Sequence, residues 1–211
     1  MNKAAALIFS GAVEGLVDEA ILRAVLKHVG LRAGNIYGKQ GKPDIRERIM
    51  GYNQAARHAP WVILVDLDHD AVCALDFLRS WLPRPSPYMN FRVAVRKIEA
   101  WLLADRDRIA NFLGISVSKV PGNPDGLNDP KQTMVSLASR SRRRDIRQDM
   151  VPRPESGRQV GPAYASRLIE FTNDPLRGWR PDVAAEYSES LRHFLSSLCR
   201  RIEGDVDSGK N

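Results

Sequence analysis

Apolar runs and helical spacings alternate along the first half of the chain. The apolar runs predict strands, at residues 4–9, 34–38, 61–65 and 89–95. Helical patterns follow these runs, over residues 16–29, 43–58, 71–82 and 97–114. The run WVILV at 61–65 is typical of a strand buried on both faces of a parallel sheet, because it is continuous and rich in β-branched residues. The alternation predicts an α/β fold with a small, mainly parallel four-stranded sheet flanked by helices.

The pattern changes after about residue 115. The stretch PGNPDGLNDP is dense in turn residues and indicates a loop. Helical patterns then resume at 131–140, near 162–172 and at 182–203, and no strand signal accompanies them. We therefore predict two domains: an α/β domain over 1–115, and a helical, basic C-terminal extension over 116–211 that packs on it.

The composition is typical of a globular protein and gives no sign of a membrane-spanning or disulfide-rich one. The 211 residues are 43% hydrophobic and 27% charged, which is a globular balance. No apolar stretch approaches the roughly 20 residues of a membrane helix, and the first residues do not resemble a signal peptide. Two cysteines provide neither a disulfide framework nor a zinc motif. We expect a cytoplasmic protein without membrane association.

The positive charge is concentrated in one segment. The chain has a net charge of +7, and residues 131–167 hold nine basic and three acidic side chains. Such an excess predicts nucleic acid as a partner, with DNA favoured over RNA. The candidates for phosphate contacts are Lys131, Arg142, Arg143, Arg144 and Arg147. Aromatic residues are sparse there, which favours backbone binding over base reading. The alternative is a solvated basic loop that pairs with its own acids.

Acidic residues follow two of the predicted strands. Glu14 lies just beyond the first strand, and Asp18 lies one helical turn further on. Asp66 and Asp68 follow the third strand, and in an extended segment both side chains would point to the same face. Asp70 comes next. Functional groups of parallel sheets collect at the carboxyl ends of strands, so we expect these acids to line one crevice.

Such a cluster predicts a bound divalent cation. Carboxylates that converge in one crevice raise each other's pKa, and a cation removes this repulsion. Oxygen ligands without Cys or paired His favour Mg²⁺ or Mn²⁺ over Zn²⁺, and such an ion can polarise a phosphodiester. Two structural alternatives stay open. Asp70 could be a helix N-cap, and Asp18 with Glu19 could favour the positive end of a helix.

The two acidic motifs resemble those of the TOPRIM fold, which occurs in topoisomerases, primases, small repair proteins and OLD-family nucleases. TOPRIM domains carry a Glu after the first strand, matched by Glu14, and a DxD after a later strand, matched by Asp66 and Asp68. The EGLVDE stretch is closer to the OLD-like branch. In that branch an acid four positions after the Glu also binds metal, and Asp18 fits that position.

A second resemblance covers about residues 5 to 200. The segment RKIEAWLLAD, residues 96–105, is similar to one in a large group of bacterial TOPRIM-like proteins of unknown function, and Pro130 with Lys131 fits their PK element. That group is suspected in phage defence beside an ATPase. The resemblance implies a Rossmann-like four-stranded sheet and a Mg²⁺-dependent phosphoryl-transfer site. It also implies a separate ATPase partner, because the chain has no GxxxxGK[ST] pattern.

Three further side chains each have two interpretations. Glu99 is either a third metal ligand or an acid that favours the start of its helix. Lys131 is either a catalytic group that stabilises negative charge in a transition state or a surface lysine. His69, between the acids, is either a general base or a polar loop residue.

Together these features predict Mg²⁺-dependent phosphodiester chemistry on nucleic acid. The catalytic residues would be Glu14, Asp66, Asp68 and Lys131. The metal ligands would be Glu14, Asp18, Asp66, Asp68 and Asp70. The alternatives are a non-catalytic nucleic-acid-binding or ATPase-partner subunit, and a small-molecule phosphotransferase or phosphatase. A homo-oligomer is compatible with each of them.

Overall fold

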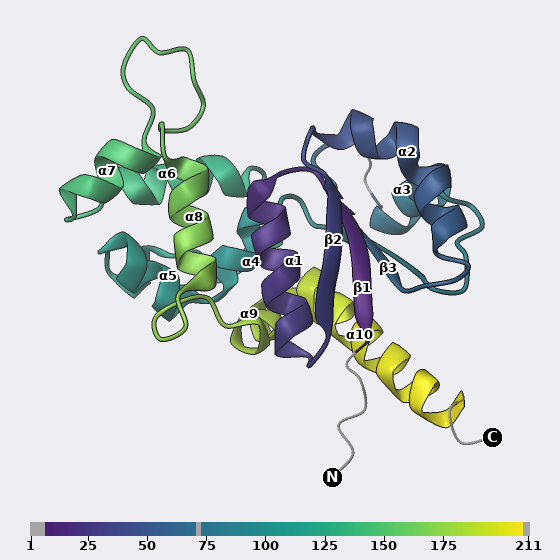
Figure 1. Ribbon diagram of the computed structural model, residues 1–211. Helices are drawn as coiled ribbons and strands as arrows, with labels where there is room; N and C mark the ends of the chain where they lie inside the picture. The colour runs from purple at the N-terminus through teal and green to yellow at the C-terminus, as the bar shows by residue number, and fades with distance from the viewer. Residues whose placement is uncertain (1–6, 71–72, 209–211) are drawn as a thin grey trace. The chain divides into compact units, whose positions relative to one another are not determined.

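The fold class predicted from the sequence is confirmed. In the computed structural model, four strands form one sheet in which every neighbouring pair is parallel (Figure 1). The strand order is β2-β1-β3-β4, and the strands are β1 (Ile8–Val13), β2 (Arg32–Gly38), β3 (Trp61–Asp66) and β4 (Met89–Ala94). The structure describes the backbone of residues 7–70 and 73–208 and side chains up to residue 200. Residues 4–6 of the first predicted strand and 71–72 of a predicted helix lie outside this part.

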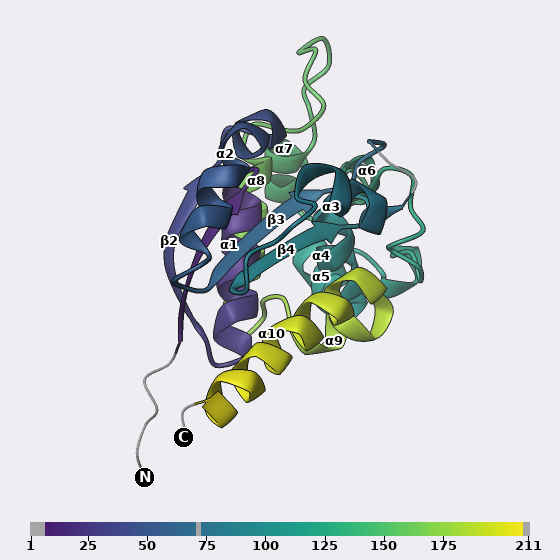
Figure 2. The ribbon, with the colours of Figure 1, turned by 90° about the vertical axis from the view of Figure 1, so that its right-hand side faces the viewer.

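Helices cover both faces of the sheet. The chain passes from β1 through α1 (Leu16–His28) to β2, and then in the opposite direction through α2 (Lys42–Ala55) to β3. Right-handed crossovers in opposite directions put their helices on opposite faces. Figures 1 and 2 show α1 on one face and α2 with α3 (Ala74–Trp81) on the other. The central strand β3 is buried from Trp61 to Val65, as its apolar run predicts.

The described chain divides into two compact units. The sheet unit comprises the residues up to Ala94 together with those from Arg192 on, and the helical unit comprises Val95–Leu191. Residues 95–115 therefore group with the helical unit in the structure. The sequence-based division into domains 1–115 and 116–211 stays a prediction.

The last helix, α10 (Glu189–Ser208), contributes to both units. In the sheet unit, Ser197 Oγ on this helix accepts hydrogen bonds from Asn90 Nδ2 at 3.0 Å and Arg92 Nε at 3.1 Å, so α10 packs against β4. None of the helices within the described residues combines the length and the apolar character needed to cross a bilayer.

The helical unit packs around a tryptophan core. Its elements are α4 (Glu99–Ala104), α5 (Arg106–Leu113), the short 3₁₀ helix η1 (Val117–Lys119), α6 (Pro130–Ser139), α7 (Arg144–Met150), α8 (Tyr164–Asn173) and α9 (Pro181–Tyr187). Trp101 is fully buried, and its carbonyl accepts a hydrogen bond from Trp179 Nε1 at 2.9 Å. The sequence pattern did not predict α7, because this helix buries only Ile146 and Met150 and so shows little periodicity.

Two long helices predicted from periodicity are each divided in the structure. The predicted helix over 97–114 breaks at Asp105, whose φ of −83° and ψ of 73° lie outside the helical region. The Asp105 carboxylate is fully buried and binds Arg180, which explains the break. The predicted helix over 182–203 is interrupted at Ser188, whose φ of −127° and ψ of 112° are extended.

Candidate functional site

Glu14 and Asp66 meet at the carboxyl edge of the sheet. β1 and β3 are neighbours, and Val13 at the end of β1 pairs with Leu64 of β3. The next residue, Glu14, therefore lies beside the end of β3. Its Oε1 accepts a hydrogen bond from the Asp66 backbone N–H at 2.7 Å. The predicted proximity of these two residues is observed.

The residues after β3 form a turn rather than an extended segment. Asp70 N donates to Leu67 O at 3.2 Å, which closes the turn. Asp68 has a φ of 49°, a left-handed conformation that Asp tolerates better than most residues. The expectation of an extended segment from Asp66 to Asp68 is therefore wrong. The turn instead directs Asp68 and Asp70 toward the same partner.

That partner is Lys42, which the sequence analysis did not identify. The chain leaving β2 folds over the end of β1, where Lys39 N donates to Val13 O at 2.8 Å and Gly41 N donates to Glu14 O at 3.0 Å. This path begins at Gly38, where φ is +82° and a Cβ would lie 2.4 Å from Val13 O, so only glycine fits. No sequence signal marked Lys42, because it reaches this site only through the pairing of β2 with β1.

Lys42 bridges the two acids of the turn. Its Nζ lies 2.6 Å from Asp68 Oδ2 and 2.7 Å from Asp70 Oδ2. Asp70 is not the N-cap of α3, because that position is occupied by Cys73. The N-cap interpretation of Asp70 is thus excluded. We call the set Glu14, Lys42, Asp66, Asp68 and Asp70 the acidic cluster.

The protonation of the acidic cluster follows from burial and charge. Burial raises the pKa of Glu14, and the hydrogen bond from Asp66 and the charge of Lys42 offset this rise only in part. Burial alone would lower the pKa of Lys42, but its hydrogen bonds to Asp68 and Asp70 outweigh burial, so its pKa is raised. Lys42 is therefore a cation at neutral pH, and the Glu14 carboxylate is more basic than an exposed one.

The raised pKa of Glu14 predicts a gain of stability in Glu14→Gln at neutral pH. A carboxyl group whose pKa is higher in the folded state than in the unfolded state costs stability once pH rises above its unfolded value. The glutamine variant lacks this cost, and its amide oxygen can still accept the Asp66 N–H. We expect Glu14→Gln to exceed wild type in urea-unfolding free energy at about pH 7, and to match it at about pH 4. A variant less stable than wild type at neutral pH would contradict this.

Asp18 is a buried residue in the first turn of α1. A Cβ added at Gly15 would lie 3.0 Å from its Oδ2, so the carboxylate points back toward the loop that carries Glu14. Its neighbour Glu19 forms ion pairs with Lys39 at 2.7 Å and Arg23 at 2.8 Å. The interpretation of Asp18 as a metal ligand stays a prediction.

The acidic cluster offers oxygen ligands of the kind that hard cations prefer. Its four acids offer only carboxylate oxygens, which Mg²⁺ and Mn²⁺ prefer. Across residues 7–70 and 73–200, however, no group of three or more His, Cys, Asp or Glu side chains is arranged to hold an ion. The cation between Asp68 and Asp70 is the Lys42 ammonium. A metal ion would have to share these two carboxylates with Lys42.

Glu99 and Lys131 form a second cluster, in the helical unit. Glu99 is buried at the start of α4, and its Oε1 accepts a hydrogen bond from Tyr164 Oη at 3.1 Å. Lys131 Nζ, in the first turn of α6, lies 3.7 Å from the same oxygen. Glu99 Oε2 is also buried and has no hydrogen-bond partner among the described residues. Lys131 is therefore more than an isolated surface lysine, although its catalytic role stays a prediction.

The arginines predicted to contact nucleic acid fall into two groups. Arg143 Nη2 lies 2.6 Å from Asp145 Oδ2, and Arg147 donates to a backbone carbonyl, so the protein itself binds both. Arg142 and Arg144 form the second group and are exposed, as are the other two arginines. The alternative that acids of this segment pair with its own basic side chains is confirmed for Asp145, which pairs with Arg143, and for Asp149, which pairs with Arg167. Phosphate binding by Arg142 and Arg144 stays a prediction.

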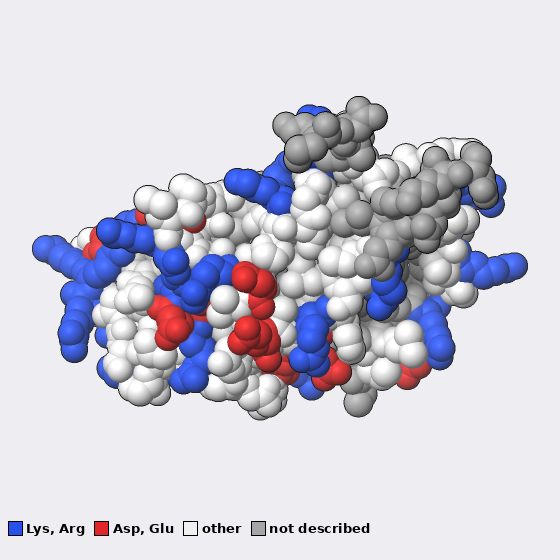
Figure 3. Space-filling model, turned by 90° about the horizontal axis from the view of Figure 1, so that it is seen from below, with Lys and Arg blue, Asp and Glu red and all other residues white. Residues whose placement is uncertain are grey.

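A cavity of about 540 Å³ in the helical unit carries mixed charge. Arg108, Arg143 and Arg177 line it together with the acids Glu170 and Asp174. Figure 3 likewise shows acidic side chains beside basic ones on the face drawn. This cavity, which Arg143 of the positive segment helps to line, is therefore not a uniformly basic site for phosphate.

Comparison of the chain with models of protein families, with curated proteins and with solved structures gave no match.

Proposed function

We propose that this protein is a Mg²⁺-dependent nuclease whose site is the acidic cluster. The observation that carries the proposal is the convergence of acids from two adjacent parallel strands. The Glu14 carboxylate, after β1, accepts a hydrogen bond from the backbone N–H of Asp66 in β3, and Asp68 and Asp70 share Lys42. Functional groups of α/β sheets gather at this edge. The raised pKa of Glu14 further suits a site that gains by binding a cation.

Each residue has a distinct part in this proposal. Glu14, Asp66 and Asp68 would hold the ion, with Asp18 and Asp70 as further ligands. Bound Mg²⁺ would supply Lewis-acid polarisation of a phosphodiester. Lys42 would donate a hydrogen bond to a phosphate oxygen, which its charged state at neutral pH favours.

Binding of the polymer would use side chains of the helical unit. Arg142 and Arg144 are exposed and lie in the segment that holds most of the net positive charge. Lys131, beside Glu99, is a further candidate for phosphate contact. DNA is the first polymer to test. Cleavage that persists after Arg142→Gln and Arg144→Gln, with an unchanged dependence of binding on salt, would exclude these contacts.

A nicking assay with Mg²⁺ tests the proposed activity. We expect wild type to nick DNA with Mg²⁺ and to lose this activity in EDTA. Glu14→Ala and Asp66→Ala should each lower the rate by about 10–100-fold, because each change disturbs ion binding. Glu47→Ala, an exposed acid on α2, is the matched control. Equal activity in wild type, Glu14→Ala and Asp66→Ala would end the catalytic proposal.

A non-catalytic binding subunit is the second candidate. It is favoured by one observation: Lys42 already neutralises Asp68 and Asp70, so these acids need no metal to be stable. Calorimetry separates the two candidates. Salt-sensitive DNA binding without any uptake of Mn²⁺ would favour the binding subunit over the nuclease.

The TOPRIM resemblance extends the proposal to a biological setting. A four-stranded parallel sheet is the fold that this resemblance implies, and Glu14, Asp66 and Asp68 occupy its motif positions. We therefore carry over a cytoplasmic location, a separate ATPase partner and a part in phage defence as components of the proposal. Co-purification of an ATPase with the tagged chain from its native host would test the partner.

A further inference from the structure

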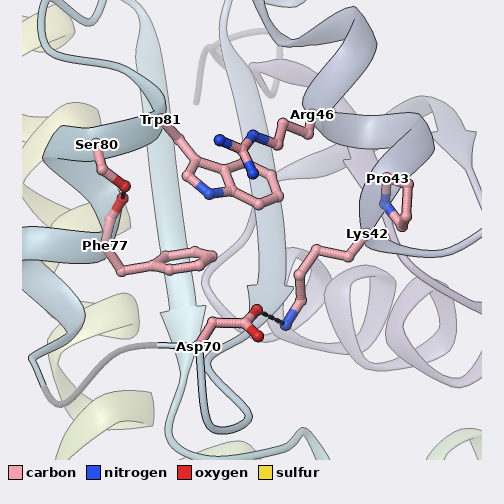
Figure 4. A pocket seen from close by; sticks show the side chains of 7 residues that line it. All are labelled: Lys42, Pro43, Arg46, Asp70, Phe77, Ser80 and Trp81. Carbon is pink, nitrogen blue, oxygen red and sulfur yellow. Dashed lines mark hydrogen bonds and ion pairs between the residues drawn. The ribbon is translucent and has the colours of Figure 1, made fainter.

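A cavity of about 420 Å³ opens beside the acidic cluster, between α2 and α3 (Figure 4). Lys42 and Arg46 line it from α2, and Phe77 and Trp81 line it from α3. Asp70 lies at its lower edge in Figure 4, where it pairs with Lys42. All of these residues belong to the sheet unit, so the cavity is defined within one compact part of the chain.

Aromatic rings and cations alternate around this cavity. The ring centroids of Phe77 and Trp81 lie 4.9 Å apart. Arg46 Cζ lies over the Trp81 ring at 5.6 Å, and Lys42 Nζ lies over the Phe77 ring at 5.8 Å. Figure 4 shows the indole projecting between Arg46 and Phe77. The cavity therefore offers flat apolar surface and positive charge within the length of one small molecule.

This combination matches the two halves of a nucleotide. Any of the nucleic-acid bases can stack on an aromatic ring, and guanidinium and ammonium groups bind phosphate oxygens. Because Arg46 lies over the indole, a phosphate bound by Arg46 would stand next to the ring on which the base stacks. The cavity volume falls within the roughly 300–1,000 Å³ of small-molecule sites.

We propose that this cavity binds one nucleotide, with its base against Trp81 and its phosphate between Arg46 and Lys42. The nucleotide is either free or one unit of a single strand, since a base within a duplex is stacked and paired and cannot enter a pocket. This inference rests on the proposed function in one respect: Lys42 would bind the phosphate of the nucleotide and would also belong to the proposed cleavage site. A phosphate on Lys42 would lie at the edge of the acidic cluster, where cleavage is proposed.

Titration in EDTA, with tryptophan fluorescence as the signal, tests the site without cleavage. The probes are adenosine monophosphate, adenosine, inorganic phosphate, single-stranded oligo(dA) and the same oligonucleotide as a duplex. We expect adenosine monophosphate to quench fluorescence and to bind at least about tenfold more tightly than adenosine or phosphate, because it engages both halves of the site. The duplex should not quench. Trp81→Phe should remove most of the quenching by adenosine monophosphate.

Arg46→Gln provides the decisive variant, because Arg46 is exposed and its loss should not unfold the chain. We expect it to weaken binding of adenosine monophosphate about tenfold. Arg48→Gln, on the same helix but paired with Asp44 outside the cavity, should bind as wild type. Equal affinities in wild type and Arg46→Gln, or quenching that survives Trp81→Phe, would overturn the proposal.

The single-stranded probe identifies the source of the nucleotide. Oligo(dA) that binds about tenfold more tightly than adenosine monophosphate assigns the site to a strand, and equal affinities assign it to a free nucleotide. Either result supports the nucleotide site. Because EDTA prevents metal-dependent cleavage, a protein that binds nucleotide but never nicks DNA would refute only the proposed function. A protein that nicks DNA but binds adenosine monophosphate equally well as wild type and as Arg46→Gln would refute only the nucleotide site.

Discussion

Replacing Lys42 by methionine is expected to lower Mg²⁺-dependent cleavage about 10²–10³-fold without weakening Mn²⁺ binding. Lys42 Nζ binds Asp68 and Asp70 at 2.6 and 2.7 Å, and the Lys42 side chain is only 15% exposed. Its raised pKa keeps it charged at neutral pH. In the proposed site it donates to a phosphate oxygen on which negative charge develops, and loss of one such donor has effects of this size. Methionine keeps an unbranched apolar stem of similar length and removes the ammonium group, with its charge and its hydrogen bonds to Asp68 and Asp70.

Mn²⁺ affinity, measured by calorimetry, separates this role from a structural one. The ammonium competes with a metal ion for the same two carboxylates, so Lys42→Met should bind Mn²⁺ at least as tightly as wild type. Lys39→Met is the matched control, since Lys39 lies shortly before Lys42 in the chain and forms its 2.7 Å ion pair with Glu19 of α1, which is not part of the acidic cluster. Wild-type cleavage by Lys42→Met would remove Lys42 from the site. Lost cleavage together with lost Mn²⁺ binding would show that Lys42 only positions the acids.

Asp105→Ala is expected to lower the free energy of unfolding by about 3 kcal/mol. The Asp105 carboxylate has no exposed surface and accepts three hydrogen bonds from Arg180. These come from the backbone N at 3.0 Å, from Nε at 3.0 Å and from Nη2 at 2.7 Å. Alanine leaves all three donors without this partner and leaves a void between α4 and α5. The expected loss is at the lower end for a broken buried pair, because the Arg180 side chain is 36% exposed and can regain water.

Urea unfolding followed by circular dichroism provides the measurement. Asp107→Ala is the matched control, because Asp107 is an exposed acid on the next helix and its loss should change stability by no more than about 0.5 kcal/mol. Asp105→Asn should fall between the two, since it keeps one acceptor and loses the charge. If Asp105→Ala were as stable as Asp107→Ala, the ion pair with Arg180 would not hold the helical unit together.

The parts of the fold that were predicted correctly are those that depend on local patterns of hydrophobic residues. The run at Trp61–Val65 predicted a buried central strand, and four such runs with helices between them predicted a parallel sheet. Glu14 and Asp66 could be paired in advance, because both follow strands of one sheet whose carboxyl ends share an edge. The uninterrupted periodicity of residues 97–114 was misleading, because the break at Asp105 comes from a partner far along the chain.

The sequence predicted the acids of the candidate site but not their arrangement. The acids were identified, but the strand-like spacing of Asp66 and Asp68 suggested an extended segment, whereas Asp68 adopts a left-handed turn. Lys42 was missed because nothing in the residues around it distinguishes it from a surface lysine. It becomes part of the cluster only because β2 lies next to β1, a strand order that periodicity does not encode.

The sequence by itself determined the α/β class, the acids at two strand ends and the excess of positive charge in residues 131–167, since these depend on local periodicity and composition. Only the tertiary structure decided which groups meet. Lys42 joins Asp68 across 26 positions and Asp105 joins Arg180 across 75. The cavity lined by Arg46 and Trp81 likewise exists only because α2 and α3 cover the same face of the sheet. Strand order and crossover direction place such residues together, and these are properties of the whole chain rather than of any segment of it.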